Sequence, residues 1–331
     1  MAVYTLLDAA SISTLLERYA IGSLAHFEPI SSGIENTNYF VWTIKQGAEK
    51  QSAWVLTIFE NLPEAELPFF TQLTAYLQAQ GFFVPAPVLQ KNGGDYFHLS
   101  IASLTAANQD QFKCGVIVPC LSGEALHAPD MSACHQVADY LARMHLALEN
   151  FPLTKPVDHG SRWFERRVQQ LLSHVQSEDA VLLGEAWARY EGYISDLNAC
   201  TIGIVHGDLF RDNVLFEQGI ISGVIDFYHA GKSPLLFDLA VLANDWAFVE
   251  EQAVYDEVKL DALVQTYAAV RPFSRAELVL WPRFLELAAF RFWLSRLKTL
   301  YQPGYQQQIK QGNSIKSPDA MKRILLAAMQ R

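Results

Sequence analysis

The chain has 331 residues, of which half are hydrophobic and 18% are charged, and its formal net charge is −10. This length allows a well-buried core in one large domain or two lobes, and the hydrophobic fraction excludes extended disorder. The acidic balance, with no lysine- and arginine-rich block, argues against nucleic acid or an acidic membrane surface as a partner. No secretory signal and no apolar run of membrane-spanning length is visible, so we expect a cytoplasmic protein without a membrane partner.

The first third of the chain has the pattern of a short helix followed by strands rich in aromatic and β-branched residues. A helix is expected over residues 11–19, with a serine cap, and a second over 67–80, with Pro68 in its first turn and Gly81 at its end. Strands are expected over residues 23–30, 34–45, 52–60, 95–103 and 112–121. These segments predict an antiparallel sheet that ends near residue 121.

From residue 130 onward the apolar residues recur at helical spacing, which predicts long helices. His145 lies on one of these apolar faces, where a histidine with its hydrogen bonds satisfied inside the core is the expected reading. The expected helices cover residues 130–148, 163–175, 185–197, 235–250, 260–270 and 275–301. The four cysteines, at positions 114, 120, 134 and 200, show no C-x-x-C spacing, which argues against a zinc site and predicts small buried residues.

One stretch between these helices carries the chemistry. The apolar run 201–205 leads into His206-Gly-Asp-Leu-Phe-Arg-Asp-Asn213, and two short strands, 214–217 and 220–225, then lead to Asp226-Phe227. A lone His-Gly-Asp is usually only a turn. A complete H-x-D-x-x-x-x-N loop that feeds a hairpin ending in a single Asp is typical of the catalytic centre of protein-kinase-like enzymes.

We therefore expect an α+β, bilobal protein-kinase-like fold. The N-terminal lobe, residues 1–121, is the expected nucleotide-binding lobe, with an antiparallel sheet. The C-terminal lobe, residues 122–331, is expected to be mainly helical and to hold the catalytic loop and the substrate site.

The chain resembles the aminoglycoside-phosphotransferase-like kinase superfamily and, within it, the bacterial homoserine kinases. The wider resemblance rests on residues 206–213 and 225–227. The narrower one rests on four distinctive strings, Gly33-Ile-Glu-Asn-Thr-Asn-Tyr-Phe40, Val55-Leu-Thr-Ile-Phe-Glu60, Asn244-Asp-Trp246 and Phe290-Arg-Phe-Trp-Leu-Ser-Arg296.

The resemblance implies that the protein uses ATP and Mg²⁺ to phosphorylate the side-chain hydroxyl of L-homoserine, a step of threonine biosynthesis. Asp208 takes the position of the catalytic base, and Asn213 and Asp226 take the positions of the metal ligands. Asp238 is expected to hold the catalytic loop by hydrogen bonds. The resemblance thus implies a small molecule, L-homoserine, as the substrate.

The nucleotide is expected to contact the turn after the first strand and the junction between the lobes. Ser32, Gly33, Asn36 and Thr37 would offer amides and hydroxyls to the phosphates, and the backbone of Cys120 and Leu121 would meet the adenine edge. Many relatives carry a phosphate-binding lysine in the third strand, where this chain has Thr57. Another cation, such as Arg211 or Lys45, would replace that lysine, or loop amides and metal ions would do so.

A small amino-acid alcohol needs a carboxylate for its ammonium and a guanidinium for its carboxylate. Asp245 and Arg291 are the candidates, with Trp246 as a wall of the pocket. If they fail, the next candidates are Tyr39, His229 and Arg296.

Two alternatives stay open. The first is another small-alcohol kinase of the same superfamily, for which an acidic groove would favour an aminoglycoside and an aromatic cage would favour choline; a sugar is a further possible acceptor. The second is an ATP-binding pseudokinase with a regulatory role. Thr57 makes the pseudokinase plausible, whereas the intact set of Asp208, Asn213 and Asp226 argues against it.

Overall fold

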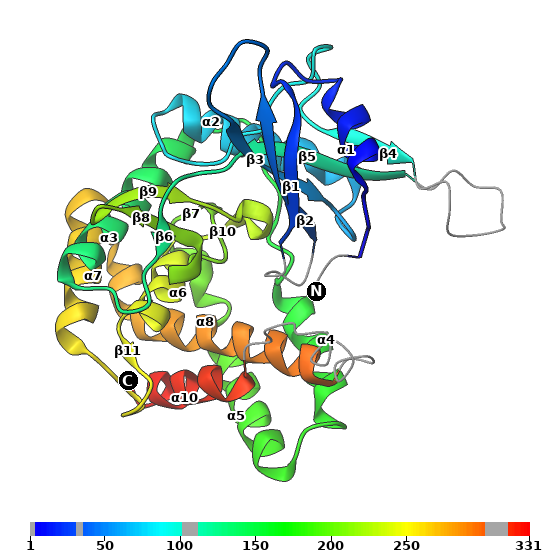
Figure 1. Cartoon of the computed structure of the whole chain (residues 1–331). Helices are drawn as coiled ribbons and strands as arrows, with labels where there is room; N and C mark the ends of the chain where they lie inside the picture. Colours follow the sequence, from blue (N-terminus) through cyan, green and yellow to red (C-terminus); the bar gives the residue numbers. More distant parts are fainter. Residues whose placement is uncertain (1–3, 31–35, 101–111, 302–316) are drawn as a thin grey trace. The chain divides into compact units, whose positions relative to one another are not determined.

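The structure, a computed structural model, describes residues 4–30, 36–100, 112–301 and 317–331. These residues form two compact units that meet in sequence between Leu121 and Ser122. The N-terminal unit comprises the described residues up to Leu121, and the C-terminal unit comprises those from Ser122 onward (Figure 1). Among the described residues, no helix is long and apolar enough to cross a membrane.

The N-terminal unit is built on one antiparallel sheet with the strand order β1-β2-β3-β5-β4. Its strands are β1 (Ser23–Pro29), β2 (Thr37–Ile44), β3 (Ser52–Ile58), β4 (Phe97–Ser100) and β5 (Phe112–Pro119). Along β2, buried and less buried residues alternate, as expected for a strand whose two faces meet different surroundings. The predicted strands are thus present, with ends shifted by a few residues.

One face of this sheet is covered by helix α1 (Ala9–Leu16), which lies beside β1 in Figure 1. Leu15 and Leu16 of α1 share a buried core cluster with Val41, Leu56 and Ile117 of the sheet. The helix begins earlier than the predicted serine cap, because the carboxylate of Asp8 accepts a hydrogen bond from the Ser11 backbone N–H at 2.8 Å. The expected start at residue 11 was therefore wrong.

Two further helices of this unit follow β3 in sequence. The short helix η1 (Glu64–Glu66) leads directly into α2 (Leu67–Ala79), which has Pro68 in its first turn. Gly81 follows the end of α2 with a φ of 87°, in the left-handed region that favours glycine. Both end signals of α2 are therefore where the sequence predicted them.

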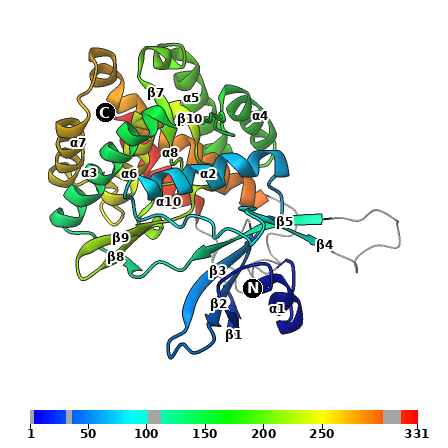
Figure 2. The same cartoon turned by 90° about the horizontal axis from the view of Figure 1, so that it is seen from above.

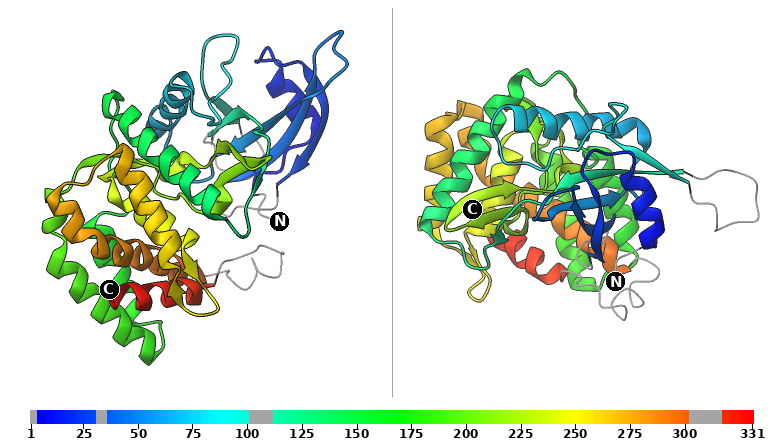
Figure 3. Two further views of the ribbon diagram at one scale, coloured as in Figure 1. Left: turned by 90° about the vertical axis from the view of Figure 1, so that its left-hand side faces the viewer. Right: turned by 45° about the horizontal axis from the view of Figure 1, so that its top comes forward.

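The C-terminal unit is mainly helical. Its long helices are α3 (Met131–Ala147), α4 (Ser161–Leu172), α5 (Ser177–Tyr193), α6 (Leu236–Trp246), α7 (Glu257–Val270), α8 (Arg275–Tyr301) and α10 (Pro318–Met329). Helix α8 contacts α4, α5, α6 and α10, and it lies among them in Figure 2. The red helix α10 lies against the orange α8 in Figure 3, and α3 packs along α7. The core of this unit is thus organised around α8.

Short strands in the same unit hold the predicted catalytic segments. Strand β7 (Ile202–Val205) pairs with β10 (Gly231–Pro234), and the hairpin of β8 (Val214–Glu217) and β9 (Ile220–Val224) is extended by β6 (Glu124–Ala125). A further pair consists of β11 (Phe248–Val249) and β12 (Val254–Tyr255). The loop 206–213 therefore lies between β7 and β8, and Asp226 lies between β9 and β10.

Candidate active site

A single buried carboxylate holds the start of the catalytic loop. Asp238, fully buried on α6, accepts hydrogen bonds from the backbone N–H groups of His206, at 2.6 Å, and Gly207, at 2.8 Å. A third bond joins it to Nε2 of His145 at 3.1 Å, and Nδ1 of His145 contacts the Tyr267 hydroxyl at 2.7 Å. Buried charge is costly unless hydrogen bonds satisfy it, and here they do. Both sequence predictions are confirmed: Asp238 holds the loop, and His145 is a satisfied core histidine.

The predicted base and one predicted metal ligand contact each other inside this loop. Nδ2 of Asn213 donates to the backbone carbonyl oxygen of Asp208 at 2.8 Å and to its Oδ2 at 3.2 Å. With its Nδ2 turned toward Asp208, the amide of Asn213 keeps its oxygen for another partner. The Asp208 side chain is thus held on the inside of the loop by the residue five positions further on.

The second predicted metal ligand reaches the same place through the hairpin. The backbone N–H of Ile225 donates to the carbonyl oxygen of Asn213 at 3.0 Å, so Asp226 follows directly after a residue bonded to Asn213. Asp226 has φ 66° and ψ 60°, a left-handed conformation that Asp and Asn adopt more readily than bulkier residues. An amide oxygen and a carboxylate at one end of a hairpin form a hard-oxygen donor set that fits Mg²⁺.

His206 ties the two segments together. Its Nδ1 accepts the backbone N–H of Asp208 at 3.2 Å, which assigns the ring proton to Nε2. Nε2 can then donate to the Ile225 carbonyl oxygen at 2.9 Å. Burial lowers the pKa of His206, although Asp238 acts in the opposite direction. The ring is therefore neutral and structural, and it sets the spacing between the loop and the hairpin end.

Gly207 has no room for a side chain. Its φ is 81°, and a Cβ added there would lie 2.5 Å from the carbonyl oxygen of His229. Gly219, in the β8–β9 turn, has a similar φ of 79°, but a Cβ there would meet no atom within 4 Å.

We expect Gly207→Ala to destabilise the protein more than Gly219→Ala and to reduce turnover. Both variants carry the left-handed strain of about 1–3 kcal/mol. Only Gly207→Ala adds a collision, which must displace the catalytic loop or His229. Urea unfolding of both variants, with kcat measured in parallel, checks this expectation. Equal losses of stability and normal turnover for Gly207→Ala would show that the loop tolerates the displacement.

The predicted substrate carboxylate is engaged by a neighbouring arginine. Asp245 accepts the backbone N–H of Arg211 at 2.7 Å and its Nε at 3.2 Å. Arg211 further donates NH2 to the Asp245 carbonyl oxygen, at 3.1 Å, and NH1 to the carbonyl oxygen of His127, at 2.7 Å. Arg211 thus anchors the catalytic loop to α6, which leaves it poorly suited to replace the missing phosphate-binding lysine.

The other two predicted substrate residues are buried in the C-terminal unit. Trp246 is 3% exposed, with its ring 6.2 Å from that of Phe216. Arg291 is 6% exposed, and its guanidinium lies 3.9 Å from the ring centre of Phe292. Burial, followed by the charge of Arg291, lowers the pKa of His229 to about 3, so this neighbouring histidine is neutral at physiological pH.

A second arginine on α8 faces the catalytic loop. The ring of Phe292 packs edge-on against Phe210 of the loop at 4.6 Å, and Arg296 lies one turn further along the same helix. Burial lowers the pKa of Arg296, while the carboxylates of Asp245, Asp212 and Asp208 act against this shift. The charge of Arg296 therefore interacts with the carboxylates around the loop, including that of the predicted base Asp208. Among the fallback candidates, Tyr39 lies instead in the N-terminal core, where its hydroxyl donates to the Thr5 carbonyl oxygen at 2.9 Å.

Of the predicted nucleotide-binding residues, Ser32 and Gly33 lie outside the described residues, and Asn36 precedes β2. The buried hydroxyl of Thr37 donates to Glu60 at 2.6 Å and accepts the backbone N–H of Thr5 at 3.1 Å. At the other end of the lobe, the backbone N–H of Cys120 donates to the Ala53 carbonyl oxygen at 3.1 Å.

Thr57 lies on β3, opposite Asn38 on β2, and its hydroxyl donates to the Asn38 side-chain oxygen at 2.7 Å. An ion pair between Lys113 and Glu60 lies in the same unit. Because side chains alternate along β5, Lys113 points to the opposite face from Val116, the cross-strand partner of Thr57. Lys113 therefore does not take the place of the missing lysine on the Thr57 face.

A cavity of about 450 Å³ lies in the C-terminal unit, at the Ile202 and Pro234 end of the β7–β10 pair. Its lining comes from residues 157–164, 190–198 and 232–237 together with Ile202 and Leu287, and it does not include Asp245, Trp246 or Arg291. The predicted substrate residues therefore do not line this cavity.

The geometry defines a protein-kinase-like phosphotransferase, and comparison with known proteins agrees. Residues 26–273 match the sequence model of the phosphotransferase enzyme family. The homoserine kinase of Cupriavidus pinatubonensis is 36% identical over 92% of this chain and 90% of its own length. That of Ralstonia nicotianae is 37% identical over 92% and 89%. The chain belongs to the phosphotransferase enzyme family and, within it, to the homoserine kinases.

Solved structures confirm the fold. An amicoumacin kinase in complex with AMP-PNP and Ca²⁺ aligns with a TM-score of 0.69 at 16% identity, covering 96% of this chain and 93% of its own. A microcompartment-associated aminopropanol kinase aligns with a TM-score of 0.67 at 18% identity, covering 98% and 97%. The predicted α+β protein-kinase-like fold is therefore confirmed.

Proposed function

We propose that this protein transfers the γ-phosphoryl group of ATP to the side-chain hydroxyl of L-homoserine and so forms O-phospho-L-homoserine. The observation that carries the proposal is the catalytic loop, in which Asn213 holds Asp208, Asp238 holds the backbone, and Asp226 follows a residue bonded to Asn213. A chain of the homoserine kinases that keeps this set intact is an active enzyme rather than a pseudokinase. It is proposed to work in the cytoplasm, where ATP is available.

Asp208 is proposed to accept, or at least orient, the proton of the attacking hydroxyl. Phosphoryl transfer depends mainly on positioning and charge stabilisation, so a carboxylate fixed at one point of the loop is what this protein must supply. The bond from Asn213 fixes one carboxylate oxygen. The other oxygen is proposed to face the substrate hydroxyl.

Asn213 and Asp226 would hold Mg²⁺ through their side-chain oxygens. When bound, the ion neutralises phosphate charge that would otherwise oppose transfer. The contribution of this chain is to preset the donors: the hairpin bond between Ile225 and Asn213 brings both residues to one end of β8 and β9.

In the N-terminal unit, some of the predicted nucleotide-binding groups already make hydrogen bonds to other residues of the unit. The proposed nucleotide contacts take these bonds into account. Because the hydroxyl of Thr37 is bonded within the lobe, Thr37 is proposed to anchor the end of the phosphate loop rather than to bind phosphate through that hydroxyl. The N–H of Cys120 is bonded to β3, so the N–H of Leu121 is the proposed donor to the adenine edge. Amides of the loop that contains Ser32, Gly33 and Asn36 are proposed to bind phosphate in place of the lysine.

Homoserine is proposed to bind with its carboxylate at Arg296. This choice replaces Arg291, which is buried against Phe292, whereas Arg296 is half-buried and interacts with the carboxylates around the loop. Asp245 stays the candidate for the ammonium, sharing its charge with Arg211. A positive charge among these carboxylates suits a zwitterionic amino acid better than a polycationic aminoglycoside or choline.

A comparison of acceptors tests this proposal. ADP release is followed with L-homoserine, with 3-amino-1-propanol, which lacks the carboxylate, and with 4-hydroxybutanoate, which lacks the amine. We expect Arg296→Ala to lower kcat/KM for homoserine about 10- to 100-fold, the effect of a hydrogen bond to a charged group. The same variant should leave kcat/KM for 3-amino-1-propanol nearly unchanged. Asp245→Asn should instead reduce the ratio of kcat/KM for L-homoserine to kcat/KM for 4-hydroxybutanoate.

Arg275→Ala serves as the control, because Arg275 is an exposed arginine at the start of the same helix. This control should keep the preference of the unmodified protein for L-homoserine over 3-amino-1-propanol. If Arg296→Ala also keeps this preference while Arg291→Ala loses it, the carboxylate of homoserine binds at Arg291. A protein that prefers an aminoglycoside or choline to homoserine would overturn the proposed substrate altogether.

A further inference from the structure

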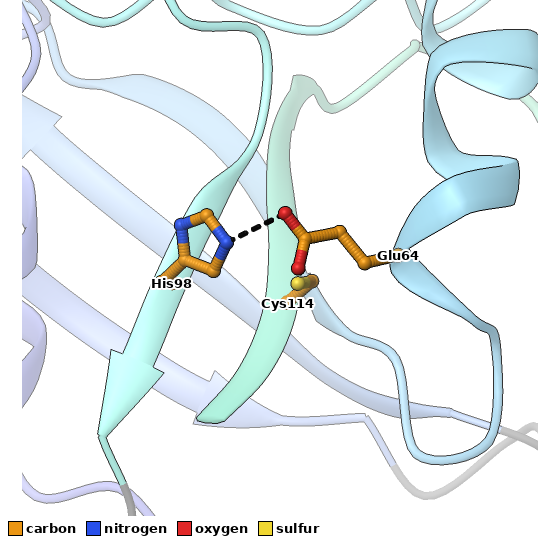
Figure 4. A group of neighbouring side chains, drawn as sticks. All are labelled: Glu64, His98 and Cys114. Carbon is orange, nitrogen blue, oxygen red and sulfur yellow. Dashed lines mark hydrogen bonds and ion pairs between the residues drawn. The ribbon is translucent and has the colours of Figure 1, made fainter. Parts of the chain in front are cut away.

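Three metal-ligating side chains meet on the sheet of the N-terminal unit, away from the catalytic loop in sequence. Glu64 comes from η1, His98 from β4 and Cys114 from β5, and they face one another in Figure 4. One ligand atom from each, an oxygen, a nitrogen and a sulfur, lies within 4.8 Å of the other two. Nothing in the proposed phosphoryl transfer uses this cluster.

The sheet register brings two of the three together. His98 and Cys114 are direct cross-strand partners, so their side chains lie on the same face and close to each other. Glu64 approaches that face from η1, and its Oε1 lies 2.9 Å from Nε2 of His98. The Tyr96 hydroxyl donates to the same carboxylate oxygen at 3.0 Å and so holds the carboxylate from outside.

The burial of the three side chains suits an ion that enters from solvent. The side chains of His98 and Glu64 are 47% and 52% exposed, whereas Cys114 is only 8% exposed. A surface pair of His and Glu is common and needs no third partner. The buried sulfur directly beneath the pair is the feature that such a pair does not explain.

We propose that Glu64, His98 and Cys114 bind one Zn²⁺ ion. Thiolate, imidazole and carboxylate are the ligand types that zinc takes in proteins, whereas Mg²⁺ favours oxygen ligands alone. Three protein ligands leave one tetrahedral position for water. Tyr96 acts as the outer partner that orients the carboxylate.

Zinc in this site joins η1 and the start of α2 to the edge of the sheet. Strand β4 is the edge strand in the order β1-β2-β3-β5-β4, and Glu64 lies three residues before α2. An ion that binds only the folded state raises stability. The bound ion should therefore raise the melting temperature of the protein.

The test uses the full chain, freed of metal with a chelator. Zinc is titrated in competition with a coloured chelator, and Co²⁺ is added separately to detect thiolate-to-cobalt charge-transfer absorption. We expect one equivalent of zinc per chain, a thiolate band with cobalt and a higher Tm with zinc. Cys114→Ser and His98→Gln should weaken binding by more than about 100-fold, and Tyr96→Phe by about 10- to 100-fold, as for outer-shell partners.

Cys120→Ser is the matched control, because Cys120 is a free, half-buried cysteine next to the same strand. It should keep both the zinc affinity and the cobalt band. His98→Gln changes an exposed side chain, so the test does not depend on the folding of the buried Cys114 variant. Zinc binding that survives Cys114→Ser and His98→Gln, or cobalt binding without a thiolate band, would show an adventitious ion only. None of these readouts involves homoserine or ATP, so failure here is separate from failure of the proposed kinase reaction.

Discussion

Asp208→Asn should lower kcat with L-homoserine about 10²- to 10⁴-fold while leaving ATP affinity close to that of the unmodified protein. The substitution removes the proton acceptor but keeps the size of the side chain. The loop itself should stay folded, because Asp238 holds it through the backbone of His206 and Gly207. Steady-state ADP release and calorimetric titration with ATP measure the two quantities.

Asp196→Asn is the control, because Asp196 is an exposed carboxylate in the same unit and has no proposed part in the reaction. It should retain normal kcat. Normal turnover by Asp208→Asn would give this aspartate a structural part and leave the reaction without the proposed base.

Asp226→Ala should remove the magnesium dependence of ATP binding and reduce kcat by about 10³-fold or more, since a metal ion contributes several kcal/mol of charge stabilisation. Alanine also strains the backbone, because position 226 has a φ of 66°. Asp226→Gly separates the two effects, since glycine accepts this conformation and offers no side-chain oxygen to a metal.

ATP affinity of both variants is measured with and without Mg²⁺. Loss of the magnesium dependence in both assigns the metal to Asp226. Loss in the alanine variant alone, with the glycine variant unchanged, would instead attribute the effect to the backbone.

The structure brings the predicted base and metal ligands close together, and this was predictable because these residues are close in sequence. The loop 206–213 and the hairpin to Asp226 span only about twenty positions, so spacing alone brings them together. Asp238 was predictable for the same reason, lying shortly after the hairpin. Strand β10, Gly-Lys-Ser-Pro, was not predicted, because it lacks an alternating apolar pattern and exists through its pairing with β7.

The candidate substrate residues were harder to predict, because α8 carries four arginines and two of them, Arg291 and Arg296, lie in its second half. Arg291 and Arg296 are five positions apart, which places them roughly 140° apart around a helix. Phe292 and Arg296 are four positions apart, so they share a face. Helix α8 is buried over much of its length, and its sequence has no polar stripe that shows which arginine faces the loop. The contact of Phe292 with Phe210 supplies that information.

The cluster of Glu64, His98 and Cys114 could not be predicted from the sequence either. Cysteine spacing argued against zinc, and no local motif joins these residues, which are separated by 34 and 16 positions. They meet because β4 pairs with β5 and because η1 precedes α2. These three side chains meet because of the sheet register, which sequence patterns specify poorly between distant strands.

The proposed function requires that the side-chain hydroxyl of L-homoserine receives the phosphoryl group. Phosphorus NMR of a reaction with L-homoserine, ATP and Mg²⁺ tests it most directly. We predict a phosphate monoester signal, coupled to the methylene protons of homoserine, that grows at the rate of ADP formation and grows about 10²- to 10⁴-fold more slowly with Asp208→Asn. ADP formed with inorganic phosphate as the only other product, or no consumption of homoserine, would contradict the proposed function.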